Sequence, residues 1–371
     1  MEFTVRKTDL VRELNLSQGV VEKKTTIQIL SNVLLEARAD HLYLTATDLE
    51  LGVRCSCPAH VVKEGSSTLP VKRLLDFVRL LPDVDVNIKI QENHWASITC
   101  GRSRTRIAGM SKESFPELPA MPPVVAEIPA SLLSSMIVRT IFAISVEESR
   151  FALNGALLLF RDGQAVMVAT DGHRMAMVQN PNPAASSPYS YRTLVPKKAM
   201  SEILKLTQES PDELLVQFSG DENHLFFQFG ERLMIGRKLT GVFPDYERVL
   251  PKDIGFNLLL SREEFRSVVE RVGQFADERS HSIRLEVSSA ELKLFSSISE
   301  TGESEETIPI EYDGASVQVA FNAQYLLDFL RAIPDEQVSL LLKSSDSAGE
   351  LRPGQASPEA QYRYVVMPMR I

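Results

Sequence analysis

The stretch AVMVATDGHRMAMV, residues 165–178, contains two apolar, strand-like runs joined by a polar turn. The turn carries Asp171 followed by glycine, a pair typical of a tight turn because Asp bonds the nearby backbone and Gly accepts a positive φ. A similar segment, LYLTATDLELGV, lies at 42–53, and its Asp48 precedes Asp171 by 123 positions. A looser copy, LKLFSSISETGE, lies at 292–303. This recurrence predicts a chain built from repeated units.

Helix-like segments recur around these strands in a constant order. One amphipathic segment precedes each strand group, at 7–16, 129–144 and 261–275, and another follows it, at 69–83, 195–212 and 321–335. Pro70, Pro196 and Asn322 hold matching places in the second set, where a helix start tolerates Pro or favours Asn. Ser261, with Glu264 three residues later, has the pattern of a capping box.

Period-two alternation of apolar and polar residues fills much of the remaining chain. It is found at 86–90, 214–218, 225–229, 233–239 and 338–342. Such alternation is typical of antiparallel strands. We therefore expect an α+β fold of three repeated domains, each with antiparallel sheets and two helices, at 1–126, 127–254 and 255–371. The alternative is three unrelated domains that look alike by chance, and the repeated spacing of four separate features argues against it.

Composition limits the classes of function. The chain has 371 residues, 44% of them hydrophobic and 24% charged, which is enough for two or three cores. A net charge of −9 argues against a protein that holds nucleic acid by bulk electrostatics. The three cysteines, Cys55, Cys57 and Cys100, fit reduced structural thiols, and we expect no metal and no cofactor. The polar start and the lack of an apolar run of about 20 residues predict a cytosolic protein.

Similar domains in one chain suggest a ring. A domain of about 125 residues approximates a sphere of radius ~18 Å, and six such spheres in a ring leave a hole of about 36 Å, whereas three leave about 5 Å. Only six comfortably pass a duplex roughly 20 Å wide. Two chains supply six domains.

Ring closure needs complementary ends, and two charged strands offer them. GRSRTR at 101–106 should place Arg102, Arg104 and Arg106 on one strand face. SETGESEET at 299–307 should place Glu303 and Glu305 on one face, with Glu300 and Glu306 nearby. Facing one another across two chains, these strands would join a head-to-tail dimer. The alternative is that both are ordinary charged edge strands guarded against aggregation.

The whole chain resembles the beta subunit of bacterial DNA polymerase III, the sliding clamp family. The residues that carry the resemblance are RFALNGALLLF (150–160), ATDGHRMA (169–176), FPDYERVLP (243–251), FNAQYLLDFL (321–330) and YVVMPMRI (364–371). The resemblance implies a non-catalytic processivity factor: a homodimeric ring that encircles duplex DNA without reading its sequence. It also implies that short peptides tether the polymerase alpha subunit, the clamp loader, other polymerases and repair proteins to the ring.

In that family the peptides enter a cleft between the second and third domains. The resemblance implies that the cleft is lined here by Leu153, Thr170, Gly172, His173, Arg174, Met175, Pro244, Arg248, Val249, Val365, Met367, Pro368, Met369 and Arg370, with Arg150, Asn322 and Tyr325 nearby. Met side chains adapt to several ligands, and we expect the four arginines to offer donors to polar peptide groups. Met175 and Ile371 replace the leucines of better-known members, so the peptide preference can differ.

Three readings compete for His173. Beside Asp171 it could act as a catalytic base, it could be purely structural, or it could line the cleft. No nucleophile elbow, zinc-protease motif, phosphate-binding loop or cysteine–histidine cluster occurs in the sequence. We therefore expect a cleft residue and no catalysis.

The resemblance also implies that Lys24, Lys72 and Lys198 face the DNA. Local excesses of basic residues in the segments 71–81 and 196–206 agree with this, although an ordinary solvated face is the alternative. Few phosphate contacts and no base-reading motif predict weak binding independent of DNA sequence. A function of a different class also remains open, namely a monomeric peptide-binding adaptor that never closes a ring.

Overall fold

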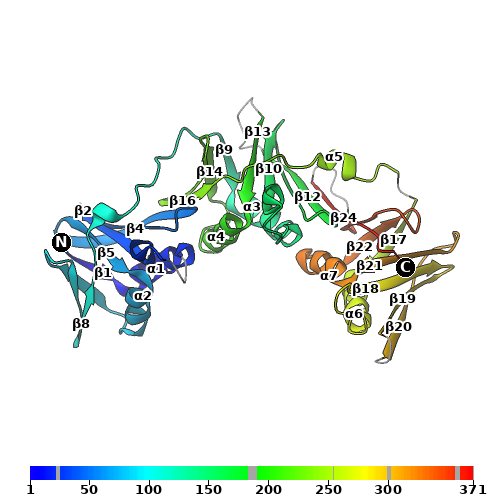
Figure 1. Cartoon of the computed structure of the whole chain (residues 1–371), viewed down its shortest axis with the longest axis horizontal. Coiled ribbons are helices and arrows are strands. Elements are labelled where there is room, and N and C mark those ends of the chain that lie inside the picture. Colours follow the sequence, from blue (N-terminus) through cyan, green and yellow to red (C-terminus); the bar gives the residue numbers. More distant parts are fainter. Residues whose placement is uncertain (22–25, 183–189, 254, 299–301, 356–359, 371) are drawn as a thin grey trace. The chain divides into compact units, whose positions relative to one another are not determined.

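The same order of elements occurs three times along the chain. The computed structural model describes residues 1–21, 26–182, 190–253, 255–298, 302–355 and 360–370. Across them, the order strand, helix, four strands, helix, three strands is repeated at Glu2–Ala108, Ala126–Arg237 and Phe256–Val366 (Figure 1). The predicted repeat is confirmed, with one strand before each leading helix that sequence analysis did not foresee.

The chain divides into two compact units. The first comprises Met1–Ser134 and Lys198–Lys238, and the second comprises Ser135–Lys197 and Leu239–Ile371. Helix α3 (Ala130–Val138) crosses from one to the other. In the part of the chain that is described, no helix has both the length and the apolar character needed to span a bilayer.

The first unit contains one antiparallel sheet of twelve strands in the described residues. These are β1 (Glu2–Arg6), β2 (Asn32–Arg38), β3 (His41–Thr47), β4 (Leu51–Lys63), β5 (Gly65–Pro70), β6 (Asp85–Ile90), β7 (Trp95–Cys100), β8 (Ser103–Ala108), β9 (Ala126–Pro129), β14 (Leu215–Gly220), β15 (His224–Phe229) and β16 (Arg232–Arg237). Its helices are α1 (Lys7–Val20), α2 (Val71–Leu80) and α4 (Lys197–Gln208), with short 3-10 turns η1 (Gln28–Ser31) and η2 (Lys112–Ser114). Strand β4 pairs with β16, so the sheet runs from the first repeat into the second.

A buried ion pair strengthens that junction. Glu13 of α1 is 1% exposed and accepts two hydrogen bonds from Arg232 of β16, at 2.8 and 3.0 Å. All three cysteines are free and buried. Burial raises the pKa of Cys57 to about 12 and that of Cys55 well above its usual value. The expectation of reduced structural thiols is confirmed.

In its described residues, the second unit contains an eight-stranded and a four-stranded antiparallel sheet. The larger has the order β13 (Tyr191–Pro196), β10 (Gly155–Arg161), β11 (Gln164–Thr170), β12 (Arg174–Pro181), β24 (Gln361–Val366), β23 (Gly349–Pro353), β22 (Gln337–Leu342) and β17 (Phe256–Ser261). The smaller has the order β20 (Gly302–Pro309), β19 (Glu291–Ile298), β18 (Ser282–Ser288) and β21 (Val317–Asn322). Pairing of β12 with β24 joins the second repeat to the third.

Two longer helices of this unit, α6 (Arg262–Gly273) and α7 (Ala323–Ala332), pack against each other and against both sheets (Figure 1). The remaining helical pieces are η3 (Ile141–Ala143), η4 (Phe151–Leu153) and α5 (Tyr246–Val249). Helices α6 and α7 start as predicted. The Ser261 hydroxyl accepts from the backbone N–H of Glu264, and the Asn322 side chain accepts from that of Tyr325.

The helix expected at 129–144 is shorter than predicted. Helix α3 ends at Val138, and the chain continues into η3. The Thr140 hydroxyl donates to the carbonyl of Met136 at 2.8 Å, and its φ of −127° has left the helical region. A side chain that bonds its own backbone in this way competes with the helix, which explains the early end.

Candidate functional site

A tight turn between β11 and β12 forms one rim of the candidate site. The Asp171 carboxylate accepts from the backbone N–H groups of His173 and Arg174 at 2.9 and 3.0 Å. Gly172 has a φ of +92°, which a residue with a Cβ adopts only with strain. The Thr170 hydroxyl donates to the carbonyl of Arg174 at 2.6 Å. The turn has the geometry predicted for its Asp-Gly pair.

Strand register builds the floor of the site. Thr170 lies opposite Met175, Met175 opposite Val365, and Val365 opposite Glu350, on four neighbouring strands. Because directly opposed residues point to the same face, these four side chains form one row across the sheet. Met175 and Val365 are 2% and 1% exposed. The apolar segment near the end of the chain is therefore strand β24, and the face of β24 that carries Val365 forms part of this floor.

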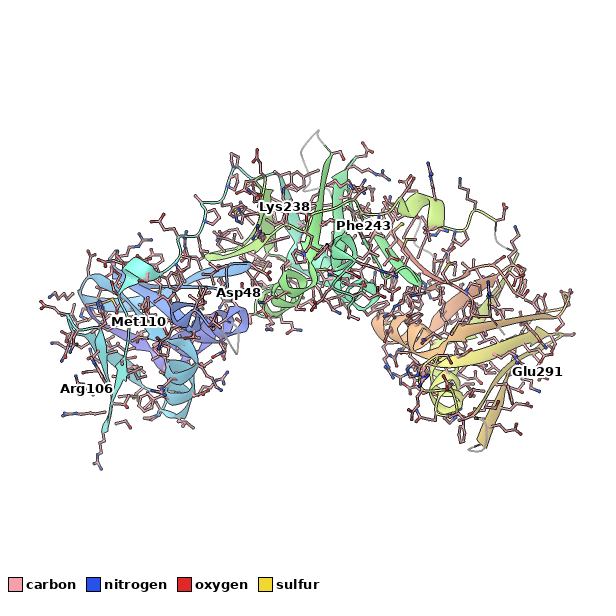
Figure 2. All side chains as sticks on the ribbon, in the orientation of Figure 1. Asp48, Arg106, Met110, Lys238, Phe243 and Glu291 are labelled. Atoms are coloured by element: carbon pink, nitrogen blue, oxygen red, sulfur yellow. The ribbon has the colours of Figure 1, made fainter. Side chains whose placement is uncertain are left out.

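The segment 243–249, which includes α5, forms a wall above the floor. Phe243 and Tyr246 are buried in the same apolar cluster as Met175 and Val365, and Figure 2 shows Phe243 beside this sheet. Between wall and floor lies a cavity of about 400 Å³. It is lined by Leu153, Thr170, Gly172, His173, Arg174, Met175, Phe243, Pro244, Tyr246, Val249, Ala348, Val365 and Met367. Ten of these residues are among the predicted cleft residues.

Three lining residues were not foreseen. Phe243 and Tyr246 belong to the quoted FPDYERVLP segment, and their aromatic character beside Pro244 was the available signal. Ala348 lies just before β23 and comes to the pocket only through the pairing of β23 with β24. Nothing in its local sequence indicates this position.

Other predicted cleft residues lie outside this lining. Arg248 of α5 has an 86% exposed side chain and pairs with Asp245. Met369 is bound by its backbone to Ala320, between Pro368 and the exposed Arg370. Asn322 caps α7 and donates to the carbonyl of Ser280.

Arg150 and Tyr325 contact residues of the turn instead. Arg150 donates to the carbonyl of Asp171 at 2.9 Å. The ring of Tyr325 lies 4.2 Å from the guanidinium carbon of Arg174.

Arg174 lines the cavity, but its guanidinium already has partners within the chain. Its side chain, expected to offer donors to a peptide, is 10% exposed and turned to the helical side of the sheet. It pairs with Asp328 of α7 at 2.5 Å and Asp171 at 3.1 Å, and donates to the carbonyl of Phe142 at 2.6 Å. Burial opposes its charge, but Tyr364 and Asp328 raise its pKa above the usual value. Strand alternation explains this arrangement: the Met175 side chain points into the pocket, and the guanidinium of its neighbour Arg174 is held on the other side by Asp328 and Phe142.

His173 is exposed at the tip of the turn. Its backbone carbonyl accepts from the N–H of Met367 at 2.9 Å, which ties the turn to the end of β24. Within the described ranges, no group of three or more His, Cys, Asp or Glu side chains could hold a metal ion.

Two charged edge strands lie where the sequence placed them, with one correction. Among the described residues, β8 pairs only with β7 and β20 only with β19. Arg104 and Arg106 are exposed on β8, which Figure 2 shows with Arg106 labelled at the outer edge of its sheet. Arg102 is not on the strand, because Gly101, at φ +57°, and Arg102 form the two-residue turn before Ser103.

On β20, Glu303 and Glu305 are exposed, and Glu305 pairs with Lys293 at 2.8 Å. Glu306 points to the other side and takes two hydrogen bonds from Arg271, each 2.6 Å long. Glu300 lies outside the described residues.

The three predicted DNA-facing lysines have different surroundings. Lys72 is exposed on the first turn of α2. Lys198, on the first turn of α4, forms an ion pair with the nearly buried carboxylate of Asp48. Lys24 lies outside the described residues.

Comparison with known proteins shows the family. Residues 1–119, 127–245 and 247–370 match the models of the N-terminal, central and C-terminal domains of the DNA polymerase III beta subunit. The chain belongs to the DNA polymerase III beta subunit family. The resemblance seen in the sequence is confirmed over nearly the whole chain.

Named relatives of the DNA polymerase III beta subunit family agree in length and fold. The beta sliding clamp of Chlamydia muridarum is 32% identical over 372 residues, covering 100% of this chain and 99% of the relative. The beta subunit structure from Pseudomonas aeruginosa is 33% identical with a TM-score of 0.93, and both chains are covered completely. A sliding clamp from Bartonella birtlesii, solved bound to griselimycin, is 31% identical with a TM-score of 0.94 over both whole chains. The chain is thus a sliding clamp, a processivity subunit and not a catalytic one.

Proposed function

We propose that the cavity between the wall 243–249 and the sheet floor is the site where this sliding clamp holds short peptides of its partners. The observation that carries the proposal is the cavity itself, about 400 Å³ in volume, whose floor has Met175 and Val365 side by side. Pockets of this size with apolar walls and few polar groups are typical ligand sites. The relative from Bartonella birtlesii, solved with griselimycin bound, supports a ligand site on this fold.

The peptide site extends beyond the cavity lining in this proposal. Arg248, Pro368, Met369 and Arg370 lie within three positions of a lining residue in the sequence. Arg150 contacts the turn, and Asn322 and Tyr325 lie at the start of α7. We assign them to flanking parts of a bound peptide. Partners would be the polymerase alpha subunit, the clamp loader, other polymerases and repair proteins.

The ring is completed by a second copy of the chain. In our proposal, β8 of one chain adds to β20 of the other, with Arg104 and Arg106 facing Glu303 and Glu305; Arg102 and Glu300 belong to the same proposed interface. Each strand has one edge without a neighbour in the described residues, and opposite charges on paired strands favour this register. Two copies give two such junctions, so the dimer closes head to tail around duplex DNA.

The chain consists of three domains in our proposal. We place them at 1–126, 127–254 and 255–371, which the separate matches to the three domain models support.

Three lysines form the proposed DNA-facing surface. Lys24, Lys72 and Lys198 would face DNA that is encircled in the cytoplasm. Because Lys198 already pairs with Asp48, its contribution to phosphate binding should be the weakest of the three.

A topological test addresses encirclement. The chain, placed on nicked circular duplex by a clamp loader, should stay on the circle at a salt concentration that removes ordinary DNA-binding proteins. Cutting the circle once should release it. Equal retention on circular and linear DNA would contradict a ring, because only a threaded ring distinguishes a closed path from an open one.

A matched pair of methionine variants tests the pocket. Met175→Ala removes a pocket floor side chain and should weaken griselimycin binding about tenfold, which corresponds to ~1.4 kcal/mol of lost apolar contact. Met167→Ala is the control, since Met167 is equally buried in β11 but does not line the cavity. Calorimetric titration measures both affinities. Equal losses in the two variants would show that the effect is loosening of the sheet and not loss of a contact.

A further inference from the structure

The wall of the pocket has little regular structure of its own to hold it. Helix α5 is a single turn of four residues, and four of the lining residues come from 243–249. Phe243 and Tyr246 anchor its buried side in the apolar cluster. These apolar contacts hold the buried side of the segment, whereas its polar groups need hydrogen-bond partners from elsewhere in the chain.

Two arginines bond this segment from outside it, and a third bonds the chain just beyond it, at Pro251. Arg192 donates to the carbonyl of Phe243 at 3.4 Å, a long bond from an exposed residue. Arg161 pairs with Glu247 at 3.0 Å, with side chains 43% and 57% exposed. Exposed pairs of this kind contribute little, because water and salt screen them. The third, Arg363, differs in both burial and geometry.

Arg363 lies on β24 and reaches the chain directly after the wall. One of its terminal nitrogens donates to the carbonyl of Pro251 at 3.0 Å. Its side chain is only 18% exposed. Proline has no N–H, so the anchoring of this residue by hydrogen bonds depends on its carbonyl.

A buried carboxylate holds Arg363 in this orientation. Glu350 is 1% exposed and receives two parallel hydrogen bonds from Arg363, at 2.6 and 2.8 Å. Such a two-pronged contact fixes the plane of the guanidinium as well as its position. Arg352 donates to the same carboxylate at 2.7 Å, so two arginines bond this buried charge.

Strand register links this cluster to the pocket. Glu350 is the end of the floor row that begins with Thr170, and Arg363 lies two residues before Val365 on the same face of β24. Ala348, two residues before Glu350, lines the cavity. The bond from Arg363 to Pro251 therefore connects the floor of the pocket with the segment that follows its wall.

We propose that Arg363, oriented by Glu350, is a positioning residue that sets the height of the wall 243–249 above the pocket floor. It touches no ligand in this role. It fixes Pro251, and thereby the end of α5, where the backbone N–H of Leu250 bonds the carbonyl of Tyr246. This proposal rests on the proposed function only for the nature of the ligand, because the bond from Arg363 to Pro251, the tether, is present in the chain without any ligand.

Three variants separate tethering from general stability. Arg363→Met removes the bond to Pro251 and the pair with Glu350. Arg363→Lys keeps a positive charge beside Glu350 but lacks the planar fork that reaches both partners at once. Arg352→Met is the matched control, because in the described residues Arg352 bonds the same carboxylate and no atom of 243–251.

Hydrogen exchange of the Leu250 amide in the free, full-length chain is the first measurement. We expect exchange about tenfold faster in both Arg363 variants and unchanged in Arg352→Met. The amide of Met367, bonded to His173 across the pocket, should keep its rate in all three. An unchanged Leu250 rate in the Arg363 variants, or the same acceleration in the control, would overturn the proposal.

Griselimycin affinity is the second measurement. We expect the dissociation constant to rise about tenfold in both Arg363 variants and less than twofold in Arg352→Met. If the wild-type chain did not bind griselimycin, the proposed pocket function would fail, while the exchange of Leu250 would still decide the tether. If all three variants lost affinity equally, the cluster would act through stability alone and the positioning role would be wrong.

Discussion

Replacing Arg174 with Met distinguishes a ligand-contacting arginine from a structural one. The guanidinium joins the turn after β11, the 3-10 turn η3 and helix α7 through Asp171, Phe142 and Asp328. Met keeps most of the aliphatic stem but none of the donors. The expected result is a large loss of stability in the second unit, even with no ligand present.

The magnitude follows from burial. Removing one partner of a buried ion pair costs ~3–5 kcal/mol, because the other charge is left uncompensated. The side chains of Asp171 and Asp328 are 15% and 20% exposed, so water reaches them partly and the lower end applies. We therefore expect Arg174→Met to lower the free energy of opening by about 3 kcal/mol, roughly a 150-fold change in the equilibrium constant.

Native-state hydrogen exchange of the β12 and β24 amides measures this opening free energy. Arg150→Met is the control, since Arg150 lies near the same turn but its ion pair with Glu147 is exposed. It should change the opening free energy by less than about 1 kcal/mol. A loss below 1 kcal/mol in Arg174→Met, together with weaker griselimycin binding, would refute our argument and return Arg174 to the role of ligand donor.

Two further predictions concern charge. Reversing Arg104 and Arg106 to Glu should shift the dimer toward monomer in sedimentation. Adding Glu303→Arg and Glu305→Arg to the same chain should restore the dimer. A dimer unaffected by the first change would place the interface elsewhere. Burial alone would raise the pKa of Glu350, but hydrogen bonds from its two arginines lower it below the ordinary 4.5. Its ionised form therefore stabilises the fold above pH ~4.5, and this contribution disappears as the pH falls through the lowered value. Glu350→Gln should cost most melting temperature at neutral pH and least in acid, and a difference independent of pH would contradict the assignment.

The fold could be predicted because its signals are local and repeated. The apolar alternation and the Asp turns recur at similar positions in the repeats. The helix starts at Ser261 and Asn322 are marked by their capping side chains. Each of these signals depends on residues within a few positions of one another. The end of α3 escaped prediction because it depends on whether the Thr140 hydroxyl bonds its own helix. Short-range pattern gives no sign of that choice.

The site could be predicted only in part. The polar turn at 170–175 and the apolar end of β24 both stand out in the sequence, but their meeting depends on strand pairing across about 190 residues, from Met175 to Val365. The orientation of Arg174 follows from strand alternation once β12 is placed. The cluster around Glu350 left no signal, because a buried carboxylate and an exposed one look the same in a sequence.

The burial of the three native thiols has a practical consequence. Thiolate is the reactive form of cysteine, and a pKa raised to about 12 at Cys57 leaves almost none of it at neutral pH. One cysteine added on an exposed loop would therefore react selectively with a maleimide dye, with Cys55, Cys57 and Cys100 left in place. Single-molecule fluorescence of loading and sliding could then use an otherwise native chain.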